Sequence, residues 1–405
     1  MSFSQAISGL NAQQQKLGAI GNNIANSQTV GFKSSDVQFA DVFANSRIGL
    51  GTKVSSVLQN FSTGNIESTS RNLDLAIGGG GFFRFQQPTG EVAYSRNGQL
   101  TMTAEGELIN AQGARIMGYP ANNNGLVQAG GAPAALNVPT GDLLAQATTN
   151  LAIEMNLDAG EEVPDPFDVT NPTPESYNFV TNATIYDSQG NSHSISLYFR
   201  KNEDLAPDEN NQWEVFAKIG DADAVPAGNL EFNNSGRQVD GAPAPVTFEL
   251  AGFDGTNIPL TFDIDLTAAT QFGNDSVVTS ATQDGYTSGA LVGITIQDDG
   301  TIMRNYSNEQ SLAAGQIALA NFRNPEGLRP VGDNLWTASQ ASGQEVVGAP
   351  GTGQLGQVVS SALESSNVDM AGELVDMIVA QRAYQANSQT IKTQDELLQT
   401  AINLR

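Results

Sequence analysis

Few residues of this chain have the types and spacing that chemistry requires, and the strongest match is a glycine pattern near its end. The hexapeptide GTGQLG at 351–356 has the spacing of a dinucleotide-binding loop, and Glu373 lies about where a ribose-binding acid is expected. That motif needs a buried strand before it and a helix that opens at it, whereas Pro350 precedes this hexapeptide and QVVSS follows it. We therefore interpret 351–356 as a glycine turn.

Metal and nucleophile chemistry lack the residues they need. The chain has no cysteine and only one histidine, His193, so neither a thiolate site nor a multi-histidine zinc site can form. No serine near His193 stands in a nucleophile motif. The acidic stretch at Asp221 begins like a calcium loop, but Val225 occupies the third ligand position and the closing glutamate is missing. We predict no catalytic residue, no metal and no cofactor, and hence no enzyme.

Composition narrows the class of partner. A net charge of −25 argues against a nucleic-acid partner and against anionic membrane surfaces, because phosphate binding needs a basic stripe. No apolar run is long enough to span a bilayer, so membrane insertion is not predicted. The N-terminus also lacks the basic and apolar segments of a cleavable secretory signal.

The negative charge is concentrated in the middle of the chain. Residues 148–281 contain 22 acidic residues against four basic ones, a net charge of −18. Residues 1–32 contain a single charged side chain, Lys16, and are rich in Gln, Asn and Ser. The two regions therefore face different surroundings.

Both ends of the chain show apolar residues at helical spacing. In the first segment Phe3, Leu10, Leu17 and Ile24 recur every seven residues, with Ile7 and Ile20 beside them. The last segment repeats this spacing with Leu363, Met370, Met377, Tyr384, Ile391 and Leu398, flanked by Leu374, Ile378 and Ile402. A heptad repeat of this length is typical of coiled coils. We predict two helices, within 1–32 and 363–405, that pair with each other.

Short β-prone runs and turn dipeptides fill the chain between these helices. Asn97-Gly98 and Asp299-Gly300 each indicate a hairpin turn. The predicted fold is mainly β with terminal α-helices, in which nested antiparallel sandwich or barrel domains are inserted between coiled-coil helices. An outer acidic β domain (148–281) interrupts an inner β domain (72–147 and 282–362). The four glycines Gly78, Gly79, Gly80 and Gly81 are predicted to form a hinge or tight joint.

The missing charges of the first helix have a physical explanation. A helix surrounded by copies of itself would place like charges close together in a poorly hydrated wall, where they repel strongly. Gln, Asn and Ser can instead hydrogen-bond to neighbours. We therefore expect the first helix to pack on all sides in an assembly, with the acidic domain facing water. A flexible polar tail is the alternative.

The residues at both ends resemble a known family. The stretch SGLNAQQQKLGAIGNNIANSQTVGFKSSDVQFADVF resembles the N-terminal signature of bacterial flagellar rod and hook proteins. Its centre is Asn23-Ile24-Ala25-Asn26, followed by Thr29, Gly31, Phe32 and Lys33. SNVDMAGELVDMIVAQRAYQANSQTIKTQDELL is similar to the C-terminal segment of that family. GGGGFFRF and DGYTSGALVGITIQDDGTI are similar to its hook members, whereas 148–281 matches least clearly.

The resemblance implies a structural subunit that polymerises into a curved tube, joins the motor's rod to the filament and transmits torque as a universal joint. It implies terminal helices in an inner tube around an export channel, and a linking segment at about 33–71. It also implies type III export to the extracellular flagellum and contacts with rod, hook-cap and hook–filament junction proteins. The expected self-assembly residues are Phe3, Ile7, Leu10, Leu17, Ile20, Asn23, Ile24, Asn26, Met370, Leu374, Met377, Tyr384, Ile391 and Leu398.

Three alternatives remain open at this point. A distal rod protein would share the ends but generally lacks so large an inserted domain. A secreted carbohydrate-binding protein or hydrolase would need an aromatic or catalytic site, and only Trp213 and Trp336 offer indole rings. An adhesin stalk would form a closed coiled-coil oligomer of fixed size.

Overall fold

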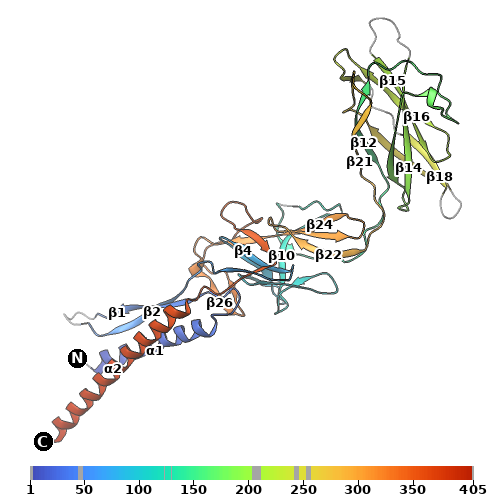
Figure 1. Ribbon diagram of the computed structural model, residues 1–405. Coiled ribbons are helices and arrows are strands. Elements are labelled where there is room, and N and C mark those ends of the chain that lie inside the picture. Colours follow the sequence, from blue (N-terminus) through green and yellow to red (C-terminus); the bar gives the residue numbers. More distant parts are fainter. Residues whose placement is uncertain are drawn as a thin grey trace. The chain divides into compact units, whose positions relative to one another are not determined.

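The structure is a computed structural model that describes residues 3–43, 49–122, 124–128, 130–202, 211–240, 246–251 and 257–403. The outermost residues of the predicted helical ranges, 1–2 and 404–405, lie outside the described residues. The chain forms two compact units. The first unit comprises Met1–Thr140, Val292–Asn305 and Ser311–Arg405, and the second comprises Gly141–Leu291 and Tyr306–Gln310. A mainly β fold with one helix near each end confirms the predicted fold class (Figure 1).

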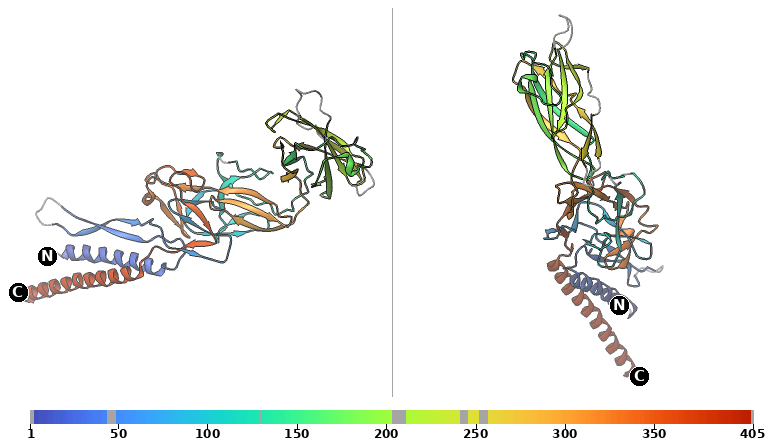
Figure 2. Two further views of the ribbon diagram at one scale, coloured as in Figure 1. Left: turned by 45° about the horizontal axis from the view of Figure 1, so that its top comes forward. Right: turned by 90° about the vertical axis from the view of Figure 1, so that its right-hand side faces the viewer.

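The two helices of the first unit lie side by side, as predicted (Figure 2). Helix α1 (Phe3–Ala25) and helix α2 (Met370–Asn403) run antiparallel, because Gly9 lies beside Asn387 while Asn23 lies beside Glu373. Two segments from opposite ends of the sequence, α1 and α2, therefore pack against each other.

The residues that are buried in α1 differ from the apolar heptad series. In α1 the buried residues are mainly small: Ala6, Gly9, Ala12, Ile20 and Asn23. A Cβ on Gly9 would lie 2.9 Å from the Asn387 Nδ2, so glycine permits the close approach. In the series, Phe3 is exposed, whereas Leu10, Leu17 and Ile24 are half-buried. At Gly9 the missing side chain lets the two helices approach closely, and the larger apolar side chains of the series stay partly exposed.

A long hairpin packs along α1. Strands β1 (Ser35–Asp41) and β2 (Thr52–Gln59) pair antiparallel, with a bulge between Gln38 and Phe39. The Ser8 Oγ accepts a hydrogen bond from the Thr52 N–H at 3.2 Å, and the Gln5 Nε2 donates to the Gly49 carbonyl at 2.6 Å. Residues of the predicted linking segment therefore form a β ribbon that rests on the helix (Figure 2).

Short strands build the β part of the first unit around one main core. Phe83, Phe85, Ile302 and Val358 lie in this core, and a smaller aromatic cluster surrounds Trp336. The strands are β3 (Ile66–Ser68), β4 (Asp74–Gly78), β5 (Phe82–Gln86), β6 (Val92–Ser95), β7 (Gly98–Gln99), β8 (Thr101–Met102), β9 (Leu108–Ile109), β10 (Arg115–Pro120), β11 (Ala134–Ala135), β22 (Leu291–Ile296), β23 (Thr301–Tyr306), β24 (Ser311–Ile317), β25 (Leu319–Asn321), β26 (Arg329–Gly332), β27 (Leu335–Thr337), β28 (Val346–Gly348), β29 (Gln357–Ser360) and β30 (Ala362–Glu364).

One of the two predicted hairpin turns is correct. Gly300 has φ of 79° and closes the turn between β22 and β23. The hairpin at Asn97-Gly98 is wrong, because β6 pairs with β5 whereas β7 pairs with β4. A Cβ on Gly98 would clash with the Leu75 carbonyl oxygen. The glycine is thus required by close packing between strands and not by a turn.

The four glycines Gly78, Gly79, Gly80 and Gly81 lie inside the first unit, between β4 and β5. The Gly356 N–H donates to the Gly80 carbonyl at 2.7 Å, and a Cβ on Gly79 would lie 3.2 Å from the Gly356 Cα. Close packing against the loop before β29 therefore gives a reason for glycine here, and the hinge role stays a prediction.

The second unit is a sandwich of two five-stranded sheets. Leu151 and Phe262 from one sheet share a core with Trp213 from the other. One sheet contains β12 (Asn150–Asp158), β18 (Val246–Ala251), β19 (Asn257–Asp265), β20 (Thr270–Phe272) and β21 (Val277–Gln283), and the other contains β13 (Phe179–Tyr186), β14 (Ser192–Lys201), β15 (Asn211–Ile219), β16 (Val225–Phe232) and β17 (Gln238–Asp240).

The strand directions of this sandwich differ in part from the antiparallel prediction. Strand β12 runs parallel to β19 and β20. A parallel pair needs a long crossover, and the whole opposite sheet lies between β12 and β19 in sequence. The chain enters and leaves the unit side by side, because Leu143 pairs with Gly289 and Gln146 with Tyr286.

Candidate functional site

The signature that follows α1 forms a tight junction between the helices and the β strands. The Asn26 side chain donates to the Asn22 carbonyl at 3.0 Å and accepts from the Thr29 hydroxyl at 3.1 Å, which closes the end of the helix. Gly31 has φ of 70°, and a Cβ there would lie 2.6 Å from the Asn97 backbone nitrogen. Only glycine fits this position without strain.

A buried ionic cluster lies directly after this turn. The Lys33 Nζ lies 2.6 Å from the Glu364 Oε1, and neither side chain is exposed to solvent. The Arg96 guanidinium lies 3.3 Å from the other oxygen of Glu364. The Lys33 Nζ also donates to the Ser62 carbonyl, and the Gly64 N–H donates to Glu364. One carboxylate therefore ties together four separate segments of the chain.

Burial dominates the electrostatics of this cluster. Burial lowers the pKa of Lys33, and the adjacent carboxylate of Glu364 offsets only part of that effect. Burial likewise lowers the pKa of Arg96, again opposed by Glu364. Because each charge is removed from water, loss of one partner would leave the others uncompensated.

A second polar contact joins three elements at the end of α1. The Asn23 Nδ2 donates to the Ser35 carbonyl at 2.9 Å and to the Glu373 Oε1 at 2.7 Å, while its oxygen accepts from the Ser35 N–H. Burial raises the pKa of Glu373, as do Asp376 and Asp36, although the Asn23 hydrogen bond opposes this rise. Asn23 thus fixes α1 against both β1 and α2.

The structure distributes the predicted self-assembly residues over three environments. Ile20 and Asn23 are buried within the chain, so any effect on assembly would be indirect. The half-buried members of the predicted set are Leu10, Leu17, Ile24, Asn26, Met377 and Ile391. The exposed members are Phe3, Ile7, Met370, Leu374, Tyr384 and Leu398. Their role in subunit contacts stays a prediction.

Sequence reasoning missed the cluster of Lys33, Arg96 and Glu364. Its only signal was Lys33 in the signature, flanked by Phe32 and polar residues. Glu364 lies 331 positions from Lys33, and no local pattern connects them.

The two features considered for bond chemistry, the 351–356 hexapeptide and His193, belong to different units. The 351–356 hexapeptide is a turn, with positive φ at Gly351 and Gly353, as predicted. His193 lies on β14, where its Nε2 is 3.0 Å from the Asp187 carboxylate. Across the same described ranges, no group of three metal-ligating side chains is found. Neither described helix has the length and apolar character required to cross a membrane.

Family models assign the chain to a class of proteins. Residues 4–33 match the model "Flagella basal body rod protein", and 359–404 match "Flagellar basal body rod FlgEFG protein C-terminal". Between them, 76–156 match "Flagellar hook protein FlgE/F/G D1 domain" and 156–286 match "Flagellar basal body protein FlaE D2 domain". Over most of its length the sequence is thus similar to flagellar rod and hook proteins.

Sequence identity to relatives that match over their full length narrows the class of protein further. The chain is 45% identical to flagellar hook protein FlgE of Escherichia coli and 44% identical to that of Salmonella typhimurium, over 100% of both chains in each case. Identity to the hook protein of Borreliella burgdorferi is 31%, over 100% of this chain and 99% of the relative. The chain belongs to the flagellar hook protein family.

A solved structure supports the fold. The crystal structure of Helicobacter pylori flagellar hook protein FlgE2 matches with a TM-score of 0.56 at 16% identity. The match covers 74% of this chain and 100% of the other.

Proposed function

We propose that this chain is the structural subunit of a bacterial flagellar hook. It polymerises into a curved tube that couples the motor's rod to the filament and transmits torque as a universal joint. The observation that carries the proposal is the full-length similarity to hook proteins, 45% identity to one of them. Because these relatives are hook proteins over their whole length, the rod alternative is not favoured.

The helix pair supports polymerisation. Leu374, Val375, Ile378 and Val379 are each about half exposed or more on α2, although a single helix partner, α1, is already in place. Apolar surface of this extent marks a protein contact. Neighbouring copies in an inner tube would bury it, and the charge-poor α1 suits such packing.

The same proposal extends to partners and location. The tube ends meet rod, hook-cap and hook–filament junction proteins, and the subunit reaches the extracellular flagellum through the type III export apparatus. The carbohydrate-binding alternative loses its platforms, because Trp213 and Trp336 are both buried.

Light scattering against protein concentration, followed by negative-stain imaging, tests the proposal. A hook subunit forms open-ended tubes above a critical concentration, because its interfaces are heterologous. A closed oligomer of fixed size, or a monomer at all concentrations in the presence of short polymer seeds, would contradict it.

A further inference from the structure

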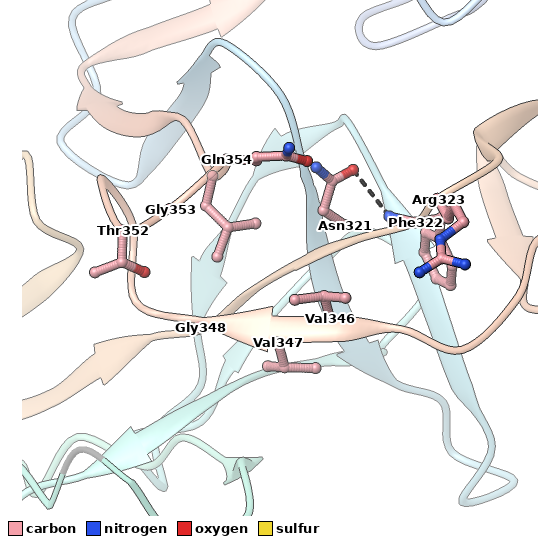
Figure 3. A pocket seen from close by; sticks show the side chains of 10 residues that line it. Asn321, Phe322, Arg323, Val346, Val347, Gly348, Thr352, Gly353 and Gln354 are labelled. Carbon is pink, nitrogen blue, oxygen red and sulfur yellow. Dashed lines mark hydrogen bonds between the residues drawn. The ribbon is translucent and has the colours of Figure 1, made fainter.

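A groove on the first unit lies beside an unpaired strand edge. Its cavity measures about 550 Å³ and lies between β28, the end of β25 and the loop 352–355. Figure 3 shows Val346 on the same side of β28 as Asn321 and Gln354, with Arg323 at one end of the groove. Among the described strands β28 pairs with β25 alone, so its other edge offers free backbone groups.

The side chains of the groove indicate what it binds. Val346 is 65% exposed, and Leu355 adds a second apolar side chain. Arg323 is exposed and has no hydrogen bond or ion pair with the residues that the structure describes. An apolar floor with a free cation at one end fits an extended peptide that carries an apolar residue close to a carboxylate.

The second unit contains a segment of this chemistry. Between β12 and β13, residues 159–178 form no strand and include prolines at 164, 166, 172 and 174. Val163 is 42% exposed, and the Asp165 carboxylate has no partner among the described residues. Irregular segments of this length are uncommon in compact domains, where they are usually either functional or disordered.

This segment is held in place on its own unit. Phe167 stacks on Phe216 with ring centroids 4.1 Å apart. Lys218 donates to the Thr170 carbonyl, and Lys201 donates to the Glu161 carbonyl. The segment is therefore fixed before any partner arrives, which lowers the entropic cost of binding.

We propose that the groove beside β28 binds residues 161–166 of a second copy, with Asp165 on Arg323 and Val163 over Val346. The partner is a copy of this chain because the proposed function makes copies the neighbours, and the inference rests on that function. The contact is heterologous, since groove and segment are different surfaces, so it can continue along a polymer. Charge complementarity selects the register.

Charge reversal tests the contact. Arg323→Glu should raise the critical concentration for polymerisation about tenfold, because it places like charges together. Asp165→Lys should act similarly, and the double variant Arg323→Glu/Asp165→Lys should recover most of the loss. Arg329→Glu is the matched control, since Arg329 is also exposed on the first unit but lies outside the groove. Equal effects of Arg323→Glu and Arg329→Glu, or no recovery in the double variant, would overturn the proposal.

Cross-linking identifies the occupant directly. The chain has no cysteine, so Gln354→Cys provides a single site for a benzophenone label in the groove. Polymers from labelled and isotope-substituted chains should give cross-links to 161–166 of a different copy. Cross-links only to other segments would contradict the proposed contact, whereas wild-type chains that form no tubes would contradict the proposed function instead.

Discussion

At the scale of single residues, the junction depends on charges that have no access to water. Lys33 and Glu364 are fully buried, and Arg96 is nearly so. Replacement of a whole buried ion pair by apolar groups can be neutral, but removal of one member leaves a buried charge without compensation. The cluster therefore acts as a unit.

Glu364→Gln should lower the free energy of unfolding of the first unit by about 3–5 kcal/mol, because Lys33 and Arg96 lose their counter-charge. Lys33→Met should also destabilise, and the double variant should cost less than the sum of the two. Urea unfolding, followed by the fluorescence of Trp336 in a Trp213→Phe background, measures the free energy of unfolding of each variant. The control is Arg115→Met, whose exposed ion pair with Glu107 should contribute at most about 1 kcal/mol. Additive effects of the two junction variants would contradict a coupled cluster.

A second residue-scale prediction concerns pH and the second unit. Burial raises the pKa of Asp187, but hydrogen bonds from His193, Asn191 and two backbone amides lower it to about 2. Because the folded pKa lies below the unfolded one, the stabilisation is complete above about pH 4 and is lost as pH falls toward 2. This stabilisation contributes about 2 kcal/mol to the free energy of unfolding. The measurement is the difference between the free energies of urea unfolding at pH 6 and at pH 2. Asp187→Asn should remove this part of the pH dependence, and an unchanged difference would refute the assignment.

At the scale of elements, local pattern predicted the helices and failed on their contacts. The seven-residue spacing located α1 and most of α2, because amphipathic periodicity is a local property. It was wrong at Leu363, which lies in strand β30 opposite Glu67, and α2 begins only at Met370. It did not reveal that Ala6, Gly9 and Ala12 are buried or that Gly9 lies against Asn387, since close approach of two backbones depends on both helices at once. Asn97-Gly98 indicates a turn by its local signal, whereas the constraint on Gly98 comes from the distant Leu75. Lys33 and Glu364 are joined only by the completed fold.

The polar face of α1 carries an element-scale prediction. Gln15 is exposed and Leu17 is half-buried in the single chain. If copies surround this helix, Gln15→Glu repeats a charge along the wall and should raise the critical concentration, with salt partly restoring assembly. Leu17→Ala should weaken assembly by about 2–5 kcal/mol if the polymer buries this side chain fully.

The critical concentrations of both variants at low and high salt provide the measurement. Gln340→Glu adds the same charge at an exposed turn of the first unit and serves as the control. A Gln15→Glu result equal to that of Gln340→Glu would mean that the polar face of α1 stays in water.

At the scale of the whole molecule, most of the negative charge belongs to the second unit. The second unit contains the 148–281 range, with its net charge of −18, and has its own core around Trp213. A unit with its own core should not be needed for the first unit to fold.

Deletion of 144–288 with a short turn joining Leu143 to Gly289 should leave the first unit folded, because these residues already pair. The shortened chain should still polymerise, with altered curvature. Circular dichroism tests folding, and negative-stain images report polymer shape. Loss of all polymers from a folded variant would show that the second unit belongs to the framework of the tube.

The pairing of Leu143 with Gly289 also has an evolutionary consequence. An insertion whose entry and exit are neighbours disturbs the host only at a single point, so it can be lost, enlarged or exchanged by a single recombination event. Within such a lineage we expect the helices and their junction to change slowly, because contacts among distant segments hold them, and the second unit to diverge in size and charge.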